Sequence, residues 1–114
     1  MKGRTIMSVA MFYYEDANNS SSSKLYPLSS EKGFMERWLP LAEELGLENV
    51  AQFDMNIYVT YKEAPIIIDE LERMKRFLSD KDPSNYGIDL MRLEKAISVL
   101  KMVQSNPKSA VSIG

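Results

Sequence analysis

The chain of 114 residues contains no cysteine and no histidine. Without cysteine there is no disulfide, no thiolate nucleophile and no cysteine-ligated metal. Without histidine there is no Ser-His-Asp triad and no imidazole acid or base near neutral pH. These absences exclude the commonest routes to covalent and metal-dependent catalysis. We therefore expect a protein that is not an enzyme and that carries no cofactor and no metal.

Long apolar runs are also missing, and glycine and proline number only five each. A bilayer span needs about 20 apolar residues, whereas the run over residues 6–14 includes Ser8 and two tyrosines, and no cleavage site follows it. We expect no membrane segment and a cytoplasmic location. The apolar fraction of 45% and the charged fraction of 26% are typical of globular proteins. The length fits a single domain spanning residues 1–114.

Excess positive charge is absent too, because the formal net charge is −2. Nucleic-acid binders need many cations to displace phosphate counterions, so we expect no nucleic-acid partner. The charge is uneven: residues 43–72 hold eight acidic side chains against Lys62 alone. Such a segment can steer a basic partner towards one surface. The alternative is that these carboxylates are simply the solvated faces of helices and loops.

The first third of the chain predicts a strand, a loop and a helix. Residues 5–14 are rich in apolar and aromatic side chains at both odd and even positions, which is typical of a central strand covered on both faces. Residues 15–30 are polar and rich in serine, which predicts a flexible loop. Ser29 or Ser30 then caps a helix that Pro40 interrupts and Gly46 ends.

Residues 51–61 alternate strictly between apolar and polar side chains. A period of two predicts a strand with one buried and one wet face. On this interpretation Asp54, Asn56 and Tyr58 all point from the wet face. Asp54 and Asn56 alone lack a third oxygen ligand, so we do not expect them to hold a cation.

The remaining pattern predicts two helices and a short strand. Helices are expected over residues 64–78, after a capping box formed by Thr60 and Glu63, and over residues 89–104. Residues 110–113 suggest an edge strand. The resulting order, β-α-β-α-α-(β), predicts a small α+β domain with a single-layer sheet and about three helices packed on it.

Two stretches support a family resemblance: Phe34-Met35-Glu36-Arg37-Trp38-Leu39-Pro40-Leu41-Ala42-Glu43-Glu44-Leu45-Gly46-Leu47, and Ile67-Ile68-Asp69-Glu70-Leu71-Glu72-Arg73-Met74-Lys75-Arg76-Phe77-Leu78. This region resembles small bacterial immunity-type proteins, the cytosolic antidotes of polymorphic or contact-dependent toxins. The resemblance implies binding to a toxin domain and occlusion of its active site, without catalysis.

The leading functional hypothesis is therefore a non-catalytic protein-binding module, an immunity-type inhibitor that docks an acidic surface on a basic toxin domain. An outward tyrosine beside carboxylates and an amide is suited to a protein interface. The expected partner-binding residues are Asp54, Asn56, Tyr58 and Glu63, with steering charges from Glu43, Glu44 and Glu48. Two alternatives remain: a self-associating structural or regulatory protein, such as a homodimer, and an enzyme that gathers carboxylates and lysine in a deep pocket.

Overall fold

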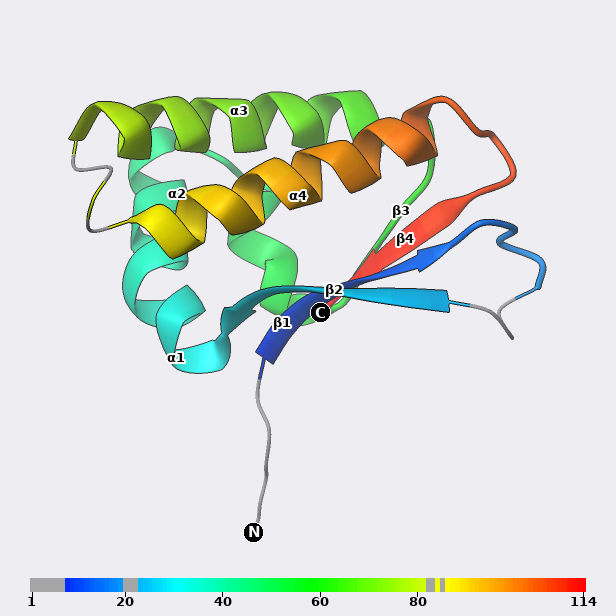
Figure 1. The fold of residues 1–114 in the computed structure, drawn as a ribbon, viewed down its shortest axis with the longest axis horizontal. Coiled ribbons are helices and arrows are strands. Elements are labelled where there is room, and N and C mark those ends of the chain that lie inside the picture. Colours follow the sequence, from blue (N-terminus) through cyan, green and yellow to red (C-terminus); the bar gives the residue numbers. More distant parts are fainter. Residues whose placement is uncertain (1–7, 20–22, 82–83, 85) are drawn as a thin grey trace, which may run out of the picture.

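The computed structural model describes residues 8–19, 23–81, 84 and 86–114 and confirms the α+β class. Its sheet has four strands in the order β2-β1-β4-β3, and every neighbouring pair is antiparallel. In Figure 1, helices α3 and α4 lie together above the sheet, while the shorter helices stand at its left end. Within the described ranges, no helix combines the length and apolarity that crossing a bilayer requires.

Strands β1 (Ser8–Tyr14) and β2 (Ser23–Ser30) form an antiparallel pair. The prediction of a loop over residues 15–30 was therefore wrong for its second half, and residues 20–22, like residues 5–7 of the first predicted strand, lie outside the described part. Pairing with β1 gives β2 its backbone partners, and alternate side chains such as Tyr26 and Leu28 pack on the core. Pro27 is tolerated because β2 is an edge strand and the β1–β2 register shifts beside it, between Val9 and Ala10.

The next segment is helical from α1 (Glu31–Gly33) through the π-helical turn η1 (Phe34–Trp38) to α2 (Leu39–Leu45). The predicted cap is confirmed, because the Ser30 hydroxyl accepts the Gly33 N–H at 2.9 Å. Pro40 has no N–H to donate, and the helix widens just before it: the Leu39 N–H donates to the Phe34 carbonyl, five residues back. Gly46 ends the helix in the left-handed conformation, at a φ of 72°, as predicted.

The strand predicted over residues 51–61 is mostly absent. Its first half is a 3-10 helix, η2 (Val50–Met55), and only β3 (Ile57–Val59) is extended. Asn56 separates the two with a φ of 62°. A 3-10 helix has three residues per turn, so Val50 and Phe53 lie on the same face, and both are buried. This segment therefore buries every third residue rather than every second one.

Helices α3 (Ala64–Lys81) and α4 (Gly87–Gln104) pack against each other as a pair. The predicted inner stripe of α3 is confirmed, since its four apolar side chains are buried: Ile67, Leu71, Met74 and Leu78. Both helices begin or end slightly beyond the predicted bounds, so the loop expected over residues 79–87 is shorter. Residues 82, 83 and 85 of that loop are outside the described part.

Strand β4 (Ala110–Ile113) is central in the sheet, not at its edge as predicted. It pairs with β1 on one side and β3 on the other, with Ile113 opposite both Met11 and Ile57. A four-residue segment is short for a central strand, but Ala110, Val111 and Ile113 are fully buried. β4 is buried because β1 and β3 pair with it on both sides. The short sequence of β4 does not itself indicate these partners.

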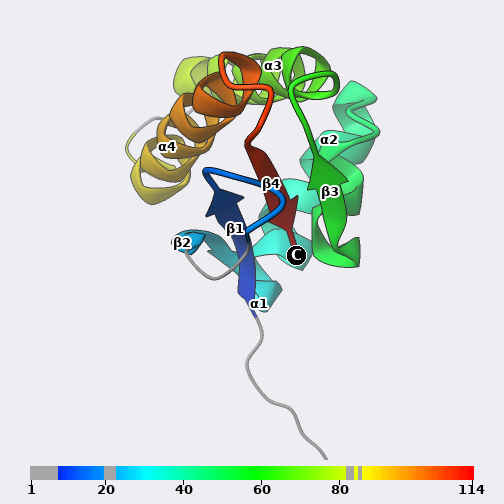
Figure 2. The ribbon, with the colours of Figure 1, turned by 90° about the vertical axis from the view of Figure 1, so that its right-hand side faces the viewer.

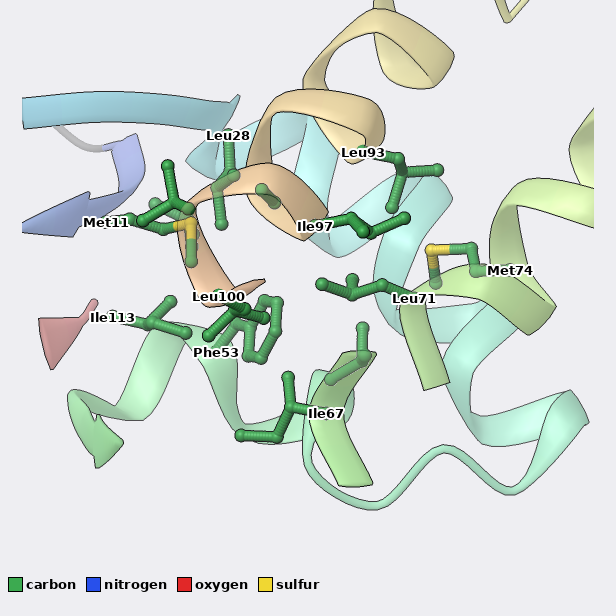
Figure 3. Close-up of a cluster of buried hydrophobic side chains, with 14 of the residues drawn as sticks. Met11, Leu28, Phe53, Ile67, Leu71, Met74, Leu93, Ile97, Leu100 and Ile113 are labelled. Carbon is green, nitrogen blue, oxygen red and sulfur yellow. The ribbon is translucent and has the colours of Figure 1, made fainter. Parts of the chain in front are cut away.

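The core lies between the sheet and the helices. Figure 3 shows Met11 and Ile113 of the sheet meeting Leu100 of α4 and Phe53 of η2. These four side chains are fully buried. Because η2 inserts an aromatic ring between strands and helices, it belongs to the core although its sequence resembles a strand.

Candidate functional site

The predicted binding panel is divided by the fold between two surfaces. The first is the sheet face turned away from α3 and α4, here called the open face. Register and alternation assign to it Ala10, Phe12, Tyr14, Ser23, Leu25, Pro27, Tyr58, Ala110 and Ser112. Tyr58 is 56% exposed on this face, so its predicted outward orientation is confirmed. Asn56, next to it, accepts a hydrogen bond from the Ser112 hydroxyl at 3.2 Å.

The second region is the run of exposed carboxylates over residues 43–54, here called the acidic shoulder: Glu43 and Glu44 on α2, Glu48 in the following turn, and Asp54 on η2. Helix η2 contacts both α2 and β3, and Figure 2 shows α2 and β3 on the same side of the molecule. Strand parity had placed Asp54 on one face with Tyr58, but η2 is helical, so that argument fails for Asp54.

A surface hollow of about 210 Å³ lies within the acidic shoulder. Its lining includes two of the shoulder carboxylates and several small or apolar residues: Ala42, Glu43, Gly46, Leu47, Glu48 and Ala51. Cations border this region: the Arg73 guanidinium donates to the Leu45 carbonyl at 3.1 Å, and Glu44 lines a separate hollow together with Arg37 and Lys81. The shoulder therefore offers negative charge around a shallow apolar floor, which suits a protruding basic side chain of a partner.

The Glu63 carboxylate is engaged in local hydrogen bonds and is not a free group on either surface. Its carboxylate accepts the Thr60 backbone N–H at 2.8 Å and the Thr60 hydroxyl at 2.6 Å. The side-chain hydrogen bond from Thr60, followed by the backbone one, lowers the pKa of Glu63. This confirms the predicted pairing at the start of α3, and it means that Glu63 acts first as a helix cap.

Sequence reasoning missed a buried carboxylate, Asp89, in the first turn of α4. Asp89 is 5% exposed. It accepts the Arg37 Nε–H at 2.9 Å and the Trp38 Nε1–H at 3.0 Å. The hydrogen bond that the Arg37 guanidinium donates to Asp89 is the main cause that raises the pKa of Arg37. The network ties η1 to the start of α4, and both carboxylate oxygens are engaged in it.

A second buried carboxylate, Glu70 on α3, holds the start of η2. One oxygen accepts the Asn49 and Val50 backbone N–H groups, both at 3.0 Å, and the other accepts the Asn49 side-chain amide at 2.6 Å. Glu70 lies three residues after Ile67 and four before Met74, so its place on the buried stripe is visible in the sequence. It is one of the eight acidic residues counted above, and its burial removes it from the acidic surface.

Neither buried carboxylate is available for acid–base work while it holds these donors. Among the residues that the structure describes, no three acidic side chains converge closely enough to hold a metal ion. What the surfaces offer chemically is charge on the acidic shoulder and uncharged apolar area on the open face. No family model, curated protein or solved structure matches this chain.

Proposed function

We propose that this chain is a non-catalytic protein-binding module whose acidic shoulder docks on a basic protein surface. The observation that carries the proposal is the gathering of four exposed carboxylates within residues 43–54, a stretch without lysine or arginine. Complementary charge accelerates encounter with a basic partner and selects against acidic ones. Arg73, at the border of the shoulder, limits the acidic area on the α3 side.

The arrangement of the other carboxylates supports a role without catalysis. Glu70 and Asp89 are buried and occupied by structural hydrogen bonds. Glu63 caps a helix. A carboxylate enzyme needs at least one free acid or base aimed at a substrate in a concave site, and these three groups are used elsewhere.

In its most specific form the proposal is an immunity-type inhibitor, an antidote that occludes the active site of a basic toxin domain in the cytoplasm of a bacterium. This form rests on the sequence resemblance and on the sign of the shoulder's charge. The hollow between Glu43 and Glu48 would receive a lysine or arginine of the toxin. Tyr58, on the open face, and Asn56 beside it are outside the docking surface on this proposal.

The test measures binding to the toxin-like domain encoded by the neighbouring reading frame. The test variant neutralises the acidic shoulder through Glu43→Gln, Glu44→Gln, Glu48→Gln and Asp54→Asn. A matched control makes the same change in net charge at exposed sites elsewhere: Glu15→Gln, Glu31→Gln, Asp80→Asn and Glu94→Gln. Stopped-flow association rates are recorded at low and high salt.

We expect the shoulder variant to associate at least about tenfold more slowly at low salt, and to lose most of the salt dependence. The control should stay within about threefold of the unmodified protein, because only a general field effect remains. Equal loss in the two variants would show that net charge alone matters. Unchanged binding by the shoulder variant would refute the docking surface.

A further inference from the structure

One row of residues crosses all four strands of the open face, with large apolar or aromatic side chains on three of them and Ser112 on β4. Leu25 pairs with Phe12, Phe12 with Ser112, and Ser112 with Tyr58. Three members of this row are large and exposed, with exposed fractions of 59% for Leu25, 36% for Phe12 and 56% for Tyr58. Isolated exposed apolar residues need no explanation, but a contiguous row on a sheet marks an interaction surface.

The open face is also uncharged, since none of its nine residues is acidic or basic. A basic or acidic partner would find no opposite charge there. In a twofold dimer, by contrast, each surface meets its own copy, so any charge near the axis faces a like charge. A neutral face of apolar and hydroxyl side chains avoids this repulsion and complements itself.

We propose that the open face is the interface of a reversible homodimer, in which the sheets of two copies pack face to face. Sheets pack in this way about 10 Å apart when side chains interdigitate. The row has the uneven height that interdigitation needs, because the small Ser112 lies between the large Phe12 and Tyr58. A ring from the second copy fits over this low point.

The size of the face sets the strength of the dimer. Four strands about 4.8 Å apart, mostly four to eight residues long, give a face roughly 19 Å by 15 Å. This is less area than the roughly 800 Å² per partner of a standard stable interface. The dimer is therefore expected to be weak and reversible.

Sedimentation equilibrium over concentrations from about 1 to 500 μM tests the proposal directly. The unmodified chain should shift from the 13.0 kDa of one copy towards twice that mass. The test variant combines Leu25→Lys with Tyr58→Lys, which sets like charges on the two opposing faces. The matched control combines Ile66→Lys with Ile88→Lys, at helix positions that are 60% and 67% exposed.

We expect the test variant to remain monomeric at every concentration and the control to dimerise like the unmodified chain. Circular dichroism establishes that each variant is folded; if the double variant is not, Leu25→Lys alone replaces it and should weaken the dimer at least about tenfold. An unmodified chain that stays monomeric at 500 μM, or a dimer lost in the control but kept in the test variant, would overturn the proposal. The shoulder variant should still dimerise, so this proposal can fail independently of the proposed function.

Discussion

Single residues in this protein show that the sign of a side chain's charge does not give its role. Asp89 and Glu70 are acidic, yet both are buried and hold donors from another element. Asp89 joins η1 to α4, and Glu70 joins α3 to η2. Removing a buried acceptor leaves its donors without partners. The resulting loss of stability is larger than the net stabilisation that the hydrogen bonds provide. These two residues are therefore expected to be sensitive positions for stability.

Substitution of Asp89 by alanine is expected to lower the free energy of unfolding by about 2–3 kcal/mol. Trp38 Nε1 would lose its acceptor inside the protein. The Arg37 side chain is 48% exposed, so water can solvate its freed charge, which keeps the loss below that of a fully buried pair. Urea denaturation measures the change, with Glu94→Ala on the exposed face of α4 as control. A loss under 0.5 kcal/mol for Asp89→Ala, no larger than expected for the control, would mean that the network does not stabilise the fold.

Elements of this chain start and stop where local chemistry dictates. Ser30 caps α1, Gly46 ends α2, and Thr60 with Glu63 begins α3. Each of these signals needs only a few neighbouring residues, which is why the sequence predicted them. The 3-10 helix η2 has no such signal: its first N–H groups are satisfied by Glu70, about twenty residues further along the chain.

The cap at the start of α3 predicts a dependence of stability on pH. The pKa of Glu63 is lowered in the folded chain from its ordinary value of 4.5. Its contribution is therefore fully present above about pH 4.5 and is lost as the pH falls through the lower folded value. Because Glu63 is exposed and screened, the effect should be under about 1 kcal/mol.

Thermal unfolding from pH 7 to pH 2 measures this contribution. Glu63→Gln keeps an acceptor oxygen but no charge, so the difference in stability from the unmodified chain should be largest at pH 7 and should vanish at low pH. Thr60→Ala removes the hydroxyl donor and should reduce the same difference in part. A gap between Glu63→Gln and the unmodified chain that persists unchanged at pH 2 would contradict the assignment to ionisation.

The whole molecule is held together by its last strand. β4 is short, but it connects β3 to the β1–β2 pair and completes the four-stranded sheet. Its inward side chains, Val111 and Ile113, are fully buried against the helices. An edge strand would add stability mainly to itself, whereas a central strand supports both of its neighbours. Changes here should therefore destabilise the entire fold.

Ile113→Ala is expected to lower the free energy of unfolding by about 2–4 kcal/mol, through lost burial and the cavity left behind. The same substitution at Ile66, which is 60% exposed on α3, should cost under 0.5 kcal/mol. Urea denaturation compares the two, and a single transition for Ile113→Ala would show that the effect reaches the whole domain. Similar losses for the two variants would contradict the central place of β4.

For the candidate site, the outward orientation of Tyr58 and the exposure of Asp54 and Asn56 could be predicted from the sequence. Their common surface could not. Alternation over residues 51–61 is compatible with a strand, but residues 50–55 form a 3-10 helix that buries Val50 and Phe53. Asp54 therefore lies on a helix rather than on the strand that carries Tyr58, and Tyr58 shares its row of the sheet with Phe12 and Leu25.

Composition and short-range patterns determined the α+β class, the two long helices with their buried stripes, and the caps and stops of the helices. These depend on side chains a few residues apart, so the chain carries them locally. The tertiary structure alone decided that residues 23–30 are a strand, that β4 is central, that Asp89 is buried, and that the polar panel is divided between two surfaces. Each of these outcomes depends on partners outside the local pattern, from β1 paired with β2 across a short connection to β1 paired with β4 across most of the chain. Hydrogen bonds and burial that form only in the folded chain select it.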